Sequence, residues 1–479
     1  MQVDALEKQA KDVLHEVISL RNALRPVNHL HPEVIALCAT FVSDTDPKPI
    51  IPLTHVCRYW RRAITSSPRN WASIGSGWKR LVPLCLGRAG TVLLTANITV
   101  SDIKGDEYFI QASLPHVSKI SHLSLTGCSS IEKVADDLPG FFASPMPNLT
   151  SLKLEQIEQP TELFPSNEAP APPLFQSISE LKSLHLTRIP LYPAVYGITS
   201  LVELELVGYE NPLDFWELVG FLRSNRTLEA VVLDLRLAEI TRIVPEQRAS
   251  LPQLRHLAFT CGSAADSRAL LSYLSLRRGV SISIQGSRSN PCAELSSFLP
   301  HHSKRIRQLF TPVTAIKYQH SPGWLRVSSG DGELSFRTPK DLSKTYGDLD
   351  LFVTGTVREF HQNINHLPAR LFERLPALEV FVLSRTHLAR GSLSALATEP
   401  ILCPSLKTIA FFDCTVSEDT VRELEAVLAK RRDSTAARLY RVVIVNGTYA
   451  LPDLRLINQL RKLVPRVDAG VGDELPDLL

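Results

Sequence analysis

A chain of 479 residues is longer than one ordinary hydrophobic core organises, so we expect several domains or one long repeat array. Hydrophobic residues make up 44% and charged residues 21%, and the net charge of +3 argues against nucleic-acid and anionic-membrane binding. The eight cysteines form no C-x-x-C pair, and no apolar run approaches the roughly 18 residues of a membrane span. We therefore expect a cytoplasmic or nuclear protein with no disulfide framework, metal site or cofactor.

Residues 1–26 are predicted to form a heptad-patterned helix that Pro26 ends. Its apolar residues recur at alternating steps of three and four: Val3, Leu6, Ala10, Val13, Val17, Leu20 and Leu24. About three heptads are marginal for an independent coiled coil. Docking on its own chain and self-association through helix 3–24 therefore both stay open.

Residues 27–75 are predicted to form a small helical domain. Pro32 suits the first position of a helix, and Glu33 in the first turn complements the helix dipole. A later helix places one apolar stripe opposite three arginines, and Pro68 closes that helix. The stripe consists of Leu53, Val56, Cys57, Trp60 and Ile64.

Residues 76–464 are predicted to form an irregular α/β leucine-rich-repeat solenoid. The pattern apolar-x-x-apolar-x-apolar recurs, and most successive copies start 20 to 33 residues apart. Copies include Ile120-Leu123-Leu125, Leu149-Leu152-Leu154, Leu181-Leu184-Leu186, Leu201-Leu204-Leu206, Leu254-Leu257-Phe259, Leu378-Phe381-Leu383 and Leu406-Ile409-Phe411. Each copy predicts a short strand, and helices are expected between copies, one of them with Asp214 as its N-cap.

Two later segments depart from the repeat. The register of the repeat is hard to follow between residues 280 and 375. We expect a β-hairpin in this range, with its turn at residues 329–332. Residues 465–479 are predicted to be a loose acidic tail. The chain carries no nucleotide-binding, metalloprotease or nucleophile-elbow motif, so we expect no catalytic residues and a protein that is not an enzyme.

The helical segment resembles the F-box, in particular the F-box-like domain of protein families expanded in fungi, where leucine-rich repeats commonly follow. That pattern is a Leu-Pro-Pro-Glu-Ile/Val opening, a Val-Cys-Arg-x-Trp helix and a Pro-x-Leu-Trp close. The matching residues are Leu30, Pro32, Glu33, Val34 and Ile35, then Leu53, Val56, Cys57, Arg58, Trp60 and Ile64, and finally Pro68 and Trp71.

The resemblance implies a substrate-recruiting receptor of an SCF-type cullin–RING ubiquitin ligase. The F-box would bind the Skp-type adaptor of the cullin complex, the repeats would bind an unknown protein substrate, and catalysis would belong to other subunits. The adaptor-binding residues it implies are Leu30, Pro32, Glu33, Ile35, Leu53, Val56, Cys57, Trp60 and Ile64. Target binding is expected at outward-facing strand residues, namely Lys153, His185, Glu205 and His256.

The chain also departs from the family pattern. Cys38 and Ala39 stand where the family usually has Ile-Phe, and His31 replaces the first proline of the opening. The alternative is therefore a leucine-rich-repeat interaction or scaffold protein whose degenerate F-box takes no part in ubiquitination.

Overall fold

The chain folds into two compact units, Met1–Tyr209 and Glu210–Leu479, and each is described by itself. The computed structural model describes residues 2–43, 50–99, 107–128, 144–156, 178, 180–188, 193–208, 213–235, 248–261, 263–286, 295–300, 308–319, 323–330, 332–338, 352, 354–363, 369–384, 393–398, 400–414, 418–432, 438–446 and 454–471. No helix in these ranges combines the length and the apolar composition that a membrane crossing requires.

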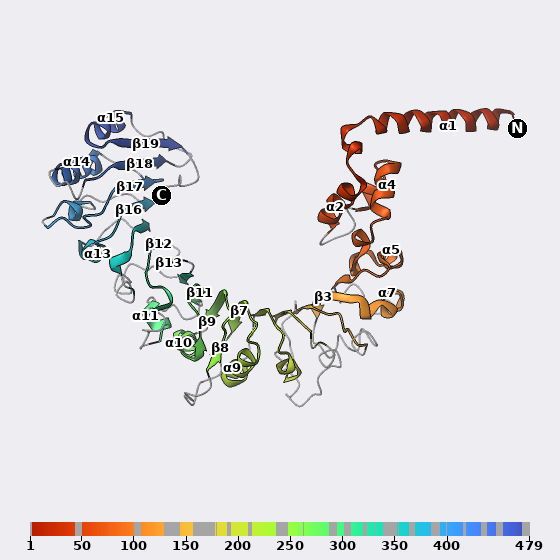
Figure 1. The fold of residues 1–479 in the computed structure, drawn as a ribbon, viewed down its shortest axis with the longest axis horizontal. Coiled ribbons are helices and arrows are strands. Elements are labelled where there is room, and N and C mark those ends of the chain that lie inside the picture. Colours follow the sequence, from red (N-terminus) through yellow and green to blue (C-terminus); the bar gives the residue numbers. More distant parts are fainter. Residues whose placement is uncertain are drawn as a thin grey trace. The chain divides into compact units, whose positions relative to one another are not determined.

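The first unit begins with helices and continues with parallel strands (Figure 1). Its α-helices are α1 (Gln2–Ala23), α2 (Pro32–Ser43), α3 (Ile50–Thr54), α4 (Arg58–Thr65), α5 (Val82–Ala89) and α7 (Glu107–Ser113). Its 3-10 helices are η1 (Pro26–His29), η2 (Pro68–Trp71), η3 (Ser76–Leu81), η4 (Leu114–Lys119) and η6 (Pro193–Gly197). Its strands are β1 (Ser73–Gly75), β2 (Leu94–Thr99), β3 (Ile120–Cys128), β4 (Ser151–Gln156), β5 (Ser183–Thr187) and β6 (Glu203–Val207).

In the second unit, helices line one side of the strands (Figure 1). The helices are α9 (Phe215–Ser224), α10 (Ala264–Tyr273), α11 (Leu295–Phe298), η8 (Thr354–Thr356), α13 (Ala369–Glu373), η9 (Ser394–Ala397), α14 (Glu418–Arg432) and α15 (Leu454–Leu463). The strands are β7 (Ala230–Leu235), β8 (Ala249–Ser250), β9 (His256–Cys261), β10 (Leu274–Ser275), β11 (Ser281–Gly286), β12 (Ala315–Gln319), β13 (Gly323–Ser329), β14 (Gly332–Thr338), β15 (Glu359–Asn363), β16 (Val380–Ser384), β17 (Thr408–Phe412), β18 (Arg441–Asn446) and β19 (Arg466–Val471).

Alternating leucines hold the parallel strands of the first unit in register. Leu152 on β4 lies opposite Leu184 on β5, which in turn lies opposite Leu204 on β6. All three side chains are buried, whereas the residues between the leucines point to the other face. Because side chains alternate with a period of two along a strand, one face of this sheet forms the core and the other remains accessible.

The second unit interrupts the parallel order with antiparallel strands. Strand β13 pairs antiparallel with both β12 and β14, whereas β14 pairs parallel with β11 and β12 pairs parallel with β15. The predicted hairpin is confirmed, because Ser329 lies opposite Gly332 across the turn. The predicted N-cap is also confirmed, since the Asp214 carboxylate accepts hydrogen bonds from the N–H groups of Trp216 and Glu217.

On β16–β18 both faces of the sheet are apolar. The ring of Phe381 packs edge-on against Phe372 of α13, so it faces the helices. The alternate residues on these strands form a second buried apolar cluster, which comprises Val380, Val382, Ala410, Phe412, Val443 and Val445. An accessible polar sheet face of the kind seen on β4–β6 therefore does not extend over these three strands.

The fold class predicted from the sequence is wrong. In place of an all-α F-box bundle followed by an irregular leucine-rich-repeat solenoid, the chain has an α/β fold whose large sheet has 17 mostly parallel strands, accompanied by helices. The segment 27–75 is not all-α, because Ser73–Gly75 forms β1 and pairs parallel with β2. Its three residues are buried, so this end of the segment belongs to the sheet.

The acidic tail also differs from its prediction. Residues Arg466–Val471 form β19, which pairs parallel with β18 through its whole length. Arg441 on β18 donates a 2.6 Å hydrogen bond to Asp468, so an acidic residue of the predicted tail is tied to the sheet. Residues 472–479 lie outside the described ranges.

Candidate functional site

The accessible face of β2–β6 is lined almost entirely by polar side chains. One row crosses five strands in register: Asn97, Ser124, Lys153, His185 and Glu205. These residues stand between the buried anchors of their strands, so the leucine core that fixes the register also fixes their spacing. We call this row and its neighbours on the same strands the polar face.

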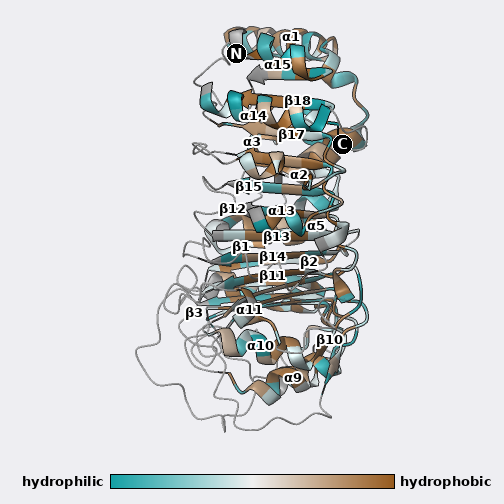
Figure 2. Cartoon of the chain, turned by 90° about the vertical axis from the view of Figure 1, so that its left-hand side faces the viewer, coloured by the Kyte–Doolittle hydropathy of each residue, from teal (hydrophilic) through white to brown (hydrophobic). Residues whose placement is uncertain are grey.

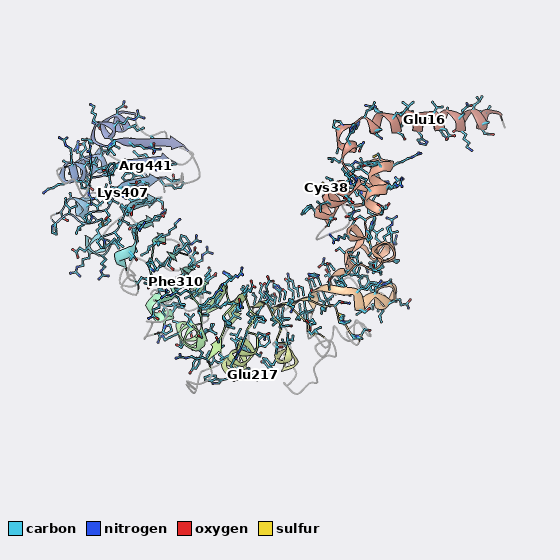
Figure 3. The ribbon with its side chains drawn as sticks, in the orientation of Figure 1. Glu16, Cys38, Glu217, Phe310, Lys407 and Arg441 are labelled. Carbon is cyan, nitrogen blue, oxygen red and sulfur yellow. The ribbon has the colours of Figure 1, made fainter. Side chains whose placement is uncertain are left out.

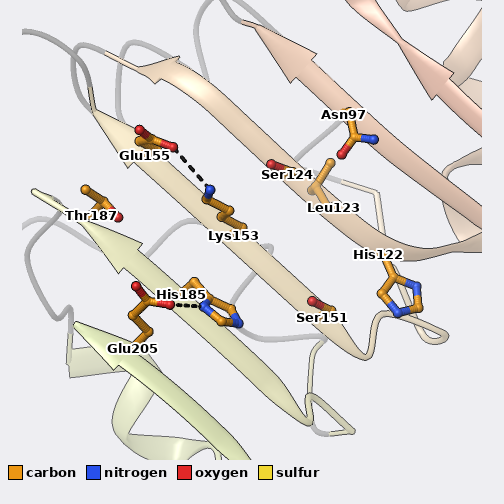
Figure 4. Close-up of a pocket in the computed structure, with 10 residues that line it drawn as sticks. All are labelled: Asn97, His122, Leu123, Ser124, Ser151, Lys153, Glu155, His185, Thr187 and Glu205. Carbon is orange, nitrogen blue, oxygen red and sulfur yellow. Dashed lines mark hydrogen bonds and ion pairs between the residues drawn. The ribbon is translucent and has the colours of Figure 1, made fainter. Parts of the chain in front are cut away.

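The polar face encloses a shallow hollow of about 590 Å³ (Figure 4). One ion pair and one hydrogen bond line it: Lys153 Nζ lies 3.3 Å from Glu155 Oε2 on the same strand, and His185 Nδ1 lies 2.6 Å from Glu205 Oε2. All four side chains keep between 29% and 48% of their surface exposed. Exposed pairs of this kind contribute little to stability, so their charges remain available to a partner.

Ser183 gives His185 a second contact that resembles the arrangement of a catalytic triad. Ser183 Oγ lies 2.7 Å from His185 Nε2, while the opposite ring nitrogen faces Glu205. Acyl transfer also needs donors aimed at a developing oxyanion. Strand β5 pairs with strands on both sides, which commits its backbone N–H groups to the ladder. These β5 N–H groups therefore cannot serve as such donors, because the sheet already engages them.

The structure brings together three of the four predicted target-binding residues. Lys153, His185 and Glu205 share one row of the polar face. His256 is exposed on β9 of the second unit and is no part of that row. The hollow is also lined by Leu123, a buried anchor predicted from the repeat pattern, and by six polar residues that the sequence analysis did not single out, each next to an apolar core residue of its strand: Asn97, His122, Ser124, Ser151, Glu155 and Thr187.

The predicted adaptor-binding residues divide by exposure. Ile35 and Ile64 are 1% and 0% exposed, so both belong to the core of the helical segment. Leu30 and Val56 are 40% and 53% exposed. Pro32 and Glu33 are also exposed, at the start of α2.

Leu53, Cys57 and Trp60 are half-buried. The indole Nε1 of Trp60 donates a 2.7 Å hydrogen bond to Asn28 Oδ1, which ties α4 to η1. Tyr59 reinforces this link, since its hydroxyl donates a 2.7 Å hydrogen bond to the carbonyl oxygen of Leu30. Trp60 therefore orders the segment as well as presenting part of its ring.

The sequence pattern predicts one apolar face on α2 that contains Val34, Ile35, Cys38 and Phe41, and the structure divides it, because Ile35 is buried whereas the other three are exposed. Val34, Leu37, Cys38 and Phe41 share the outer side of the helix, and we call them the α2 apolar face (Cys38 is marked in Figure 3). Leu37 is 56% exposed and Phe41 is 78% exposed. The signal lies in the composition, because "VIALCATFV" is apolar on every side of a helix, whereas one buried face would need only half of these residues.

Within the described ranges, no three His, Cys, Asp or Glu side chains group as metal ligands would. A scan against protein-family models gives no match to this chain, and a search of curated proteins gives none either.

Proposed function

We propose that this chain is the substrate-recruiting receptor of an SCF-type cullin–RING ubiquitin ligase. The helical segment would bind the Skp-type adaptor, and the polar face would bind the protein to be ubiquitinated. Such a receptor contributes proximity, which makes a transfer between two proteins effectively intramolecular.

The observation that carries this proposal is the α2 apolar face. Large apolar side chains seldom stand together on a surface that contacts nothing, and such patches mark protein-binding sites. Phe41 is the most exposed of the group at 78%, and exposed aromatic residues often become the anchors of an interface. Leu30 and Val56, which precede α2 and α4 in the chain, are also exposed apolar residues, and α2 packs against α4.

The α2 apolar face also bears on the departure at Cys38 and Ala39. Ala39 is 1% exposed, so a larger side chain at this position would have no room and could not reach the surface. Phe41 lies half a turn further along and supplies the exposed aromatic ring that the family pattern leads one to expect near the end of this helix. In this proposal Phe41 takes the anchoring role.

One observation favours the alternative, an interaction protein outside ubiquitination. The polar end of Trp60 is engaged by Asn28 within its own chain, and its ring is half-buried. A tryptophan whose ring and N–H group are engaged within its own chain has less surface left to bind an adaptor. The polar face would act as a binding surface in either case.

The deciding experiment is calorimetric titration of the purified full-length chain with a purified Skp-type adaptor. We expect saturable binding, and we expect Phe41→Asp to weaken it by about 30-fold or more, because losing a central aromatic anchor typically costs about 2 kcal/mol. Leu84→Asp is the matched control, since Leu84 is an exposed apolar residue of α5 (40%) outside the α2 apolar face.

Two results would contradict the proposal. One is a parent chain that shows no saturable binding to the adaptor. The other is equal weakening by Phe41→Asp and Leu84→Asp, which would mean that any added charge disturbs the contact.

The target-binding half is tested separately, by charge reversal on the polar face. Lys153→Glu and Glu205→Lys should change which proteins co-purify with the chain while leaving adaptor affinity unchanged. Lys182→Glu is the control, because Lys182 is exposed next to β5 but does not line the hollow. Identical co-purified proteins for all three variants would remove the polar face from the proposal.

A further inference from the structure

Helix α1 carries an apolar stripe that stands open to solvent. Every described side chain of α1 is exposed except Asn22, which is half-buried. Val17 is 56% exposed and Leu20 is 63% exposed. Its main packing partner among the described elements is the short η1, so folding within the chain leaves the stripe uncovered.

The stripe has the spacing of a coiled-coil seam. The a positions are Val3, Ala10, Val17 and Leu24, and the d positions are Leu6, Val13 and Leu20. Apolar and hydrophilic residues alternate along the helix (Figure 2). Most of the stability of a helix in a protein comes from packing of its apolar face, so burying this seam against a second helix would stabilise α1.

We infer that α1 pairs with α1 of a second copy of this chain in a parallel two-stranded coiled coil. Two of the heptads combine valine at a with leucine at d, namely Val3 with Leu6 and Val17 with Leu20, and this combination favours two strands over three or four. Leu14, at an e position beside the seam, is 57% exposed and widens the apolar surface at its centre. The seam is complementary to itself, as an interface between identical copies must be.

The charges beside the seam favour the parallel orientation. Glu16 occupies a g position, and Arg21 occupies the e position of the following heptad (Glu16 is marked in Figure 3). In a parallel pair, a g residue faces the e residue of the next heptad on the other helix, so Glu16 would meet Arg21 of the second copy on both sides. Antiparallel helices would place e against e and g against g instead.

This inference is independent of the adaptor surface, because α1 shares no residue with the α2 apolar face. A dimer would bring two polar faces into one assembly. A target with two matching epitopes would then be held by both copies, and the second contact would form at high effective concentration.

The test is the mass of the full-length chain, measured by sedimentation equilibrium over a wide concentration range. We expect a monomer–dimer equilibrium, and we expect Val17→Asp to weaken it about tenfold or more by placing like charges in the seam. Ser19→Asp adds the same charge at a c position, away from the seam, and should leave the equilibrium unchanged. Circular dichroism of both variants checks that α1 stays helical.

A charge exchange tests the orientation. Glu16→Arg should weaken the dimer, because the introduced guanidinium would face Arg21 of the second copy, and adding Arg21→Glu should restore it. The two positions are five residues apart on one helix and do not neighbour each other there, so restoration requires contact between helices.

Three outcomes would overturn the inference. The first is a chain that stays monomeric at every concentration, and the second is a dimer that Val17→Asp and Ser19→Asp affect equally. The third is a Val17→Asp variant of unchanged mass but reduced adaptor binding, which would assign the stripe to the adaptor. A dimer that the double exchange fails to restore would overturn the parallel arrangement.

Discussion

Trp60 and Trp71 lie eleven positions apart and give the most specific prediction, because they differ in burial and in the elements that they hold together. Trp71 is 1% exposed, its indole Nε1 donates a 3.1 Å hydrogen bond to the carbonyl oxygen of Ile64, and the guanidinium of Arg88 lies 4.3 Å from its ring centroid. It therefore fastens η2 to both α4 and α5. Trp60 is half-buried and bonded only at its polar end to Asn28.

The magnitudes follow from these contacts. Truncating a buried tryptophan to alanine costs about 3–5 kcal/mol. The lost hydrogen bond adds about 1 kcal/mol, and the lost cation–π contact adds roughly 0.5–1 kcal/mol. We therefore expect Trp71→Ala to lower the free energy of unfolding of the first unit by about 4.5–7 kcal/mol. Trp60→Ala should cost about 1–2 kcal/mol, since it removes one hydrogen bond and a partly buried ring.

The assay is chemical denaturation followed by far-ultraviolet circular dichroism, because removing a tryptophan changes the fluorescence signal itself. The chain consists of two units, so the transition of the first unit must be fitted separately. Trp71→Phe is the conservative control and should lose less than half as much stability, because it retains most of the buried ring. The reasoning fails if Trp60→Ala destabilises the first unit more than Trp71→Ala does.

Three further predictions concern a buried strand leucine, two helix cysteines and a strand carboxylate. Leu184→Ala should destabilise the first unit by about 2–5 kcal/mol in the same assay, whereas the outward-facing His185→Ala should change it by less than about 0.5 kcal/mol; equal effects would contradict the alternating burial. Mass spectrometry after brief alkylation should find exposed Cys38 modified and Cys85 intact, because burial raises the pKa of Cys85 to about 11; rapid labelling of both would contradict the packing. A hydrogen bond from the His361 imidazole lowers the pKa of Glu359 in the folded protein, so ionised Glu359 stabilises the fold above its pKa in the unfolded chain, and this stabilisation is lost as the pH falls through its pKa in the folded protein. Glu359→Gln should therefore reduce the loss of stability at acidic pH. An unchanged dependence of stability on pH would contradict this assignment.

The strands of the first unit were predictable because one buried face imposes a strict period of two. The anchors Leu152, Leu184 and Leu204 were placed correctly from spacing alone, and they lie opposite one another in the sheet. The residues between them follow automatically, which is why Lys153 and His185 could be predicted to face outward. For β4, β5 and β6, the register between neighbouring strands follows from this pattern of buried leucines.

The fold class was not predictable from the same pattern, for two local reasons. Strand β1 has only three residues, Ser73–Gly75, and so short a segment carries no periodic signal; the parallel pairing with β2 comes from tertiary contacts. In the second unit, the strands around the turn at 329–332 reverse direction within the sheet. The hairpin itself is local, whereas the pairing of β1 with β2 and the parallel pairings of β14 with β11 and of β12 with β15 join segments distant in sequence.

The helical surface shows why apolar pattern alone could not separate core from interface. On α2, Ile35 and Ala39 turn inward, and Thr40 beside them donates a 2.7 Å hydrogen bond to Asn70 of η2. That contact decides which side of an apolar helix is buried, and it leaves Phe41 outside. On the strands, a polar residue at an outward position costs no stability and is free to specify a partner. On α2, an apolar residue at an outward position such as Phe41 leaves apolar surface in contact with water, and this exposed surface is what the proposed adaptor contact would cover.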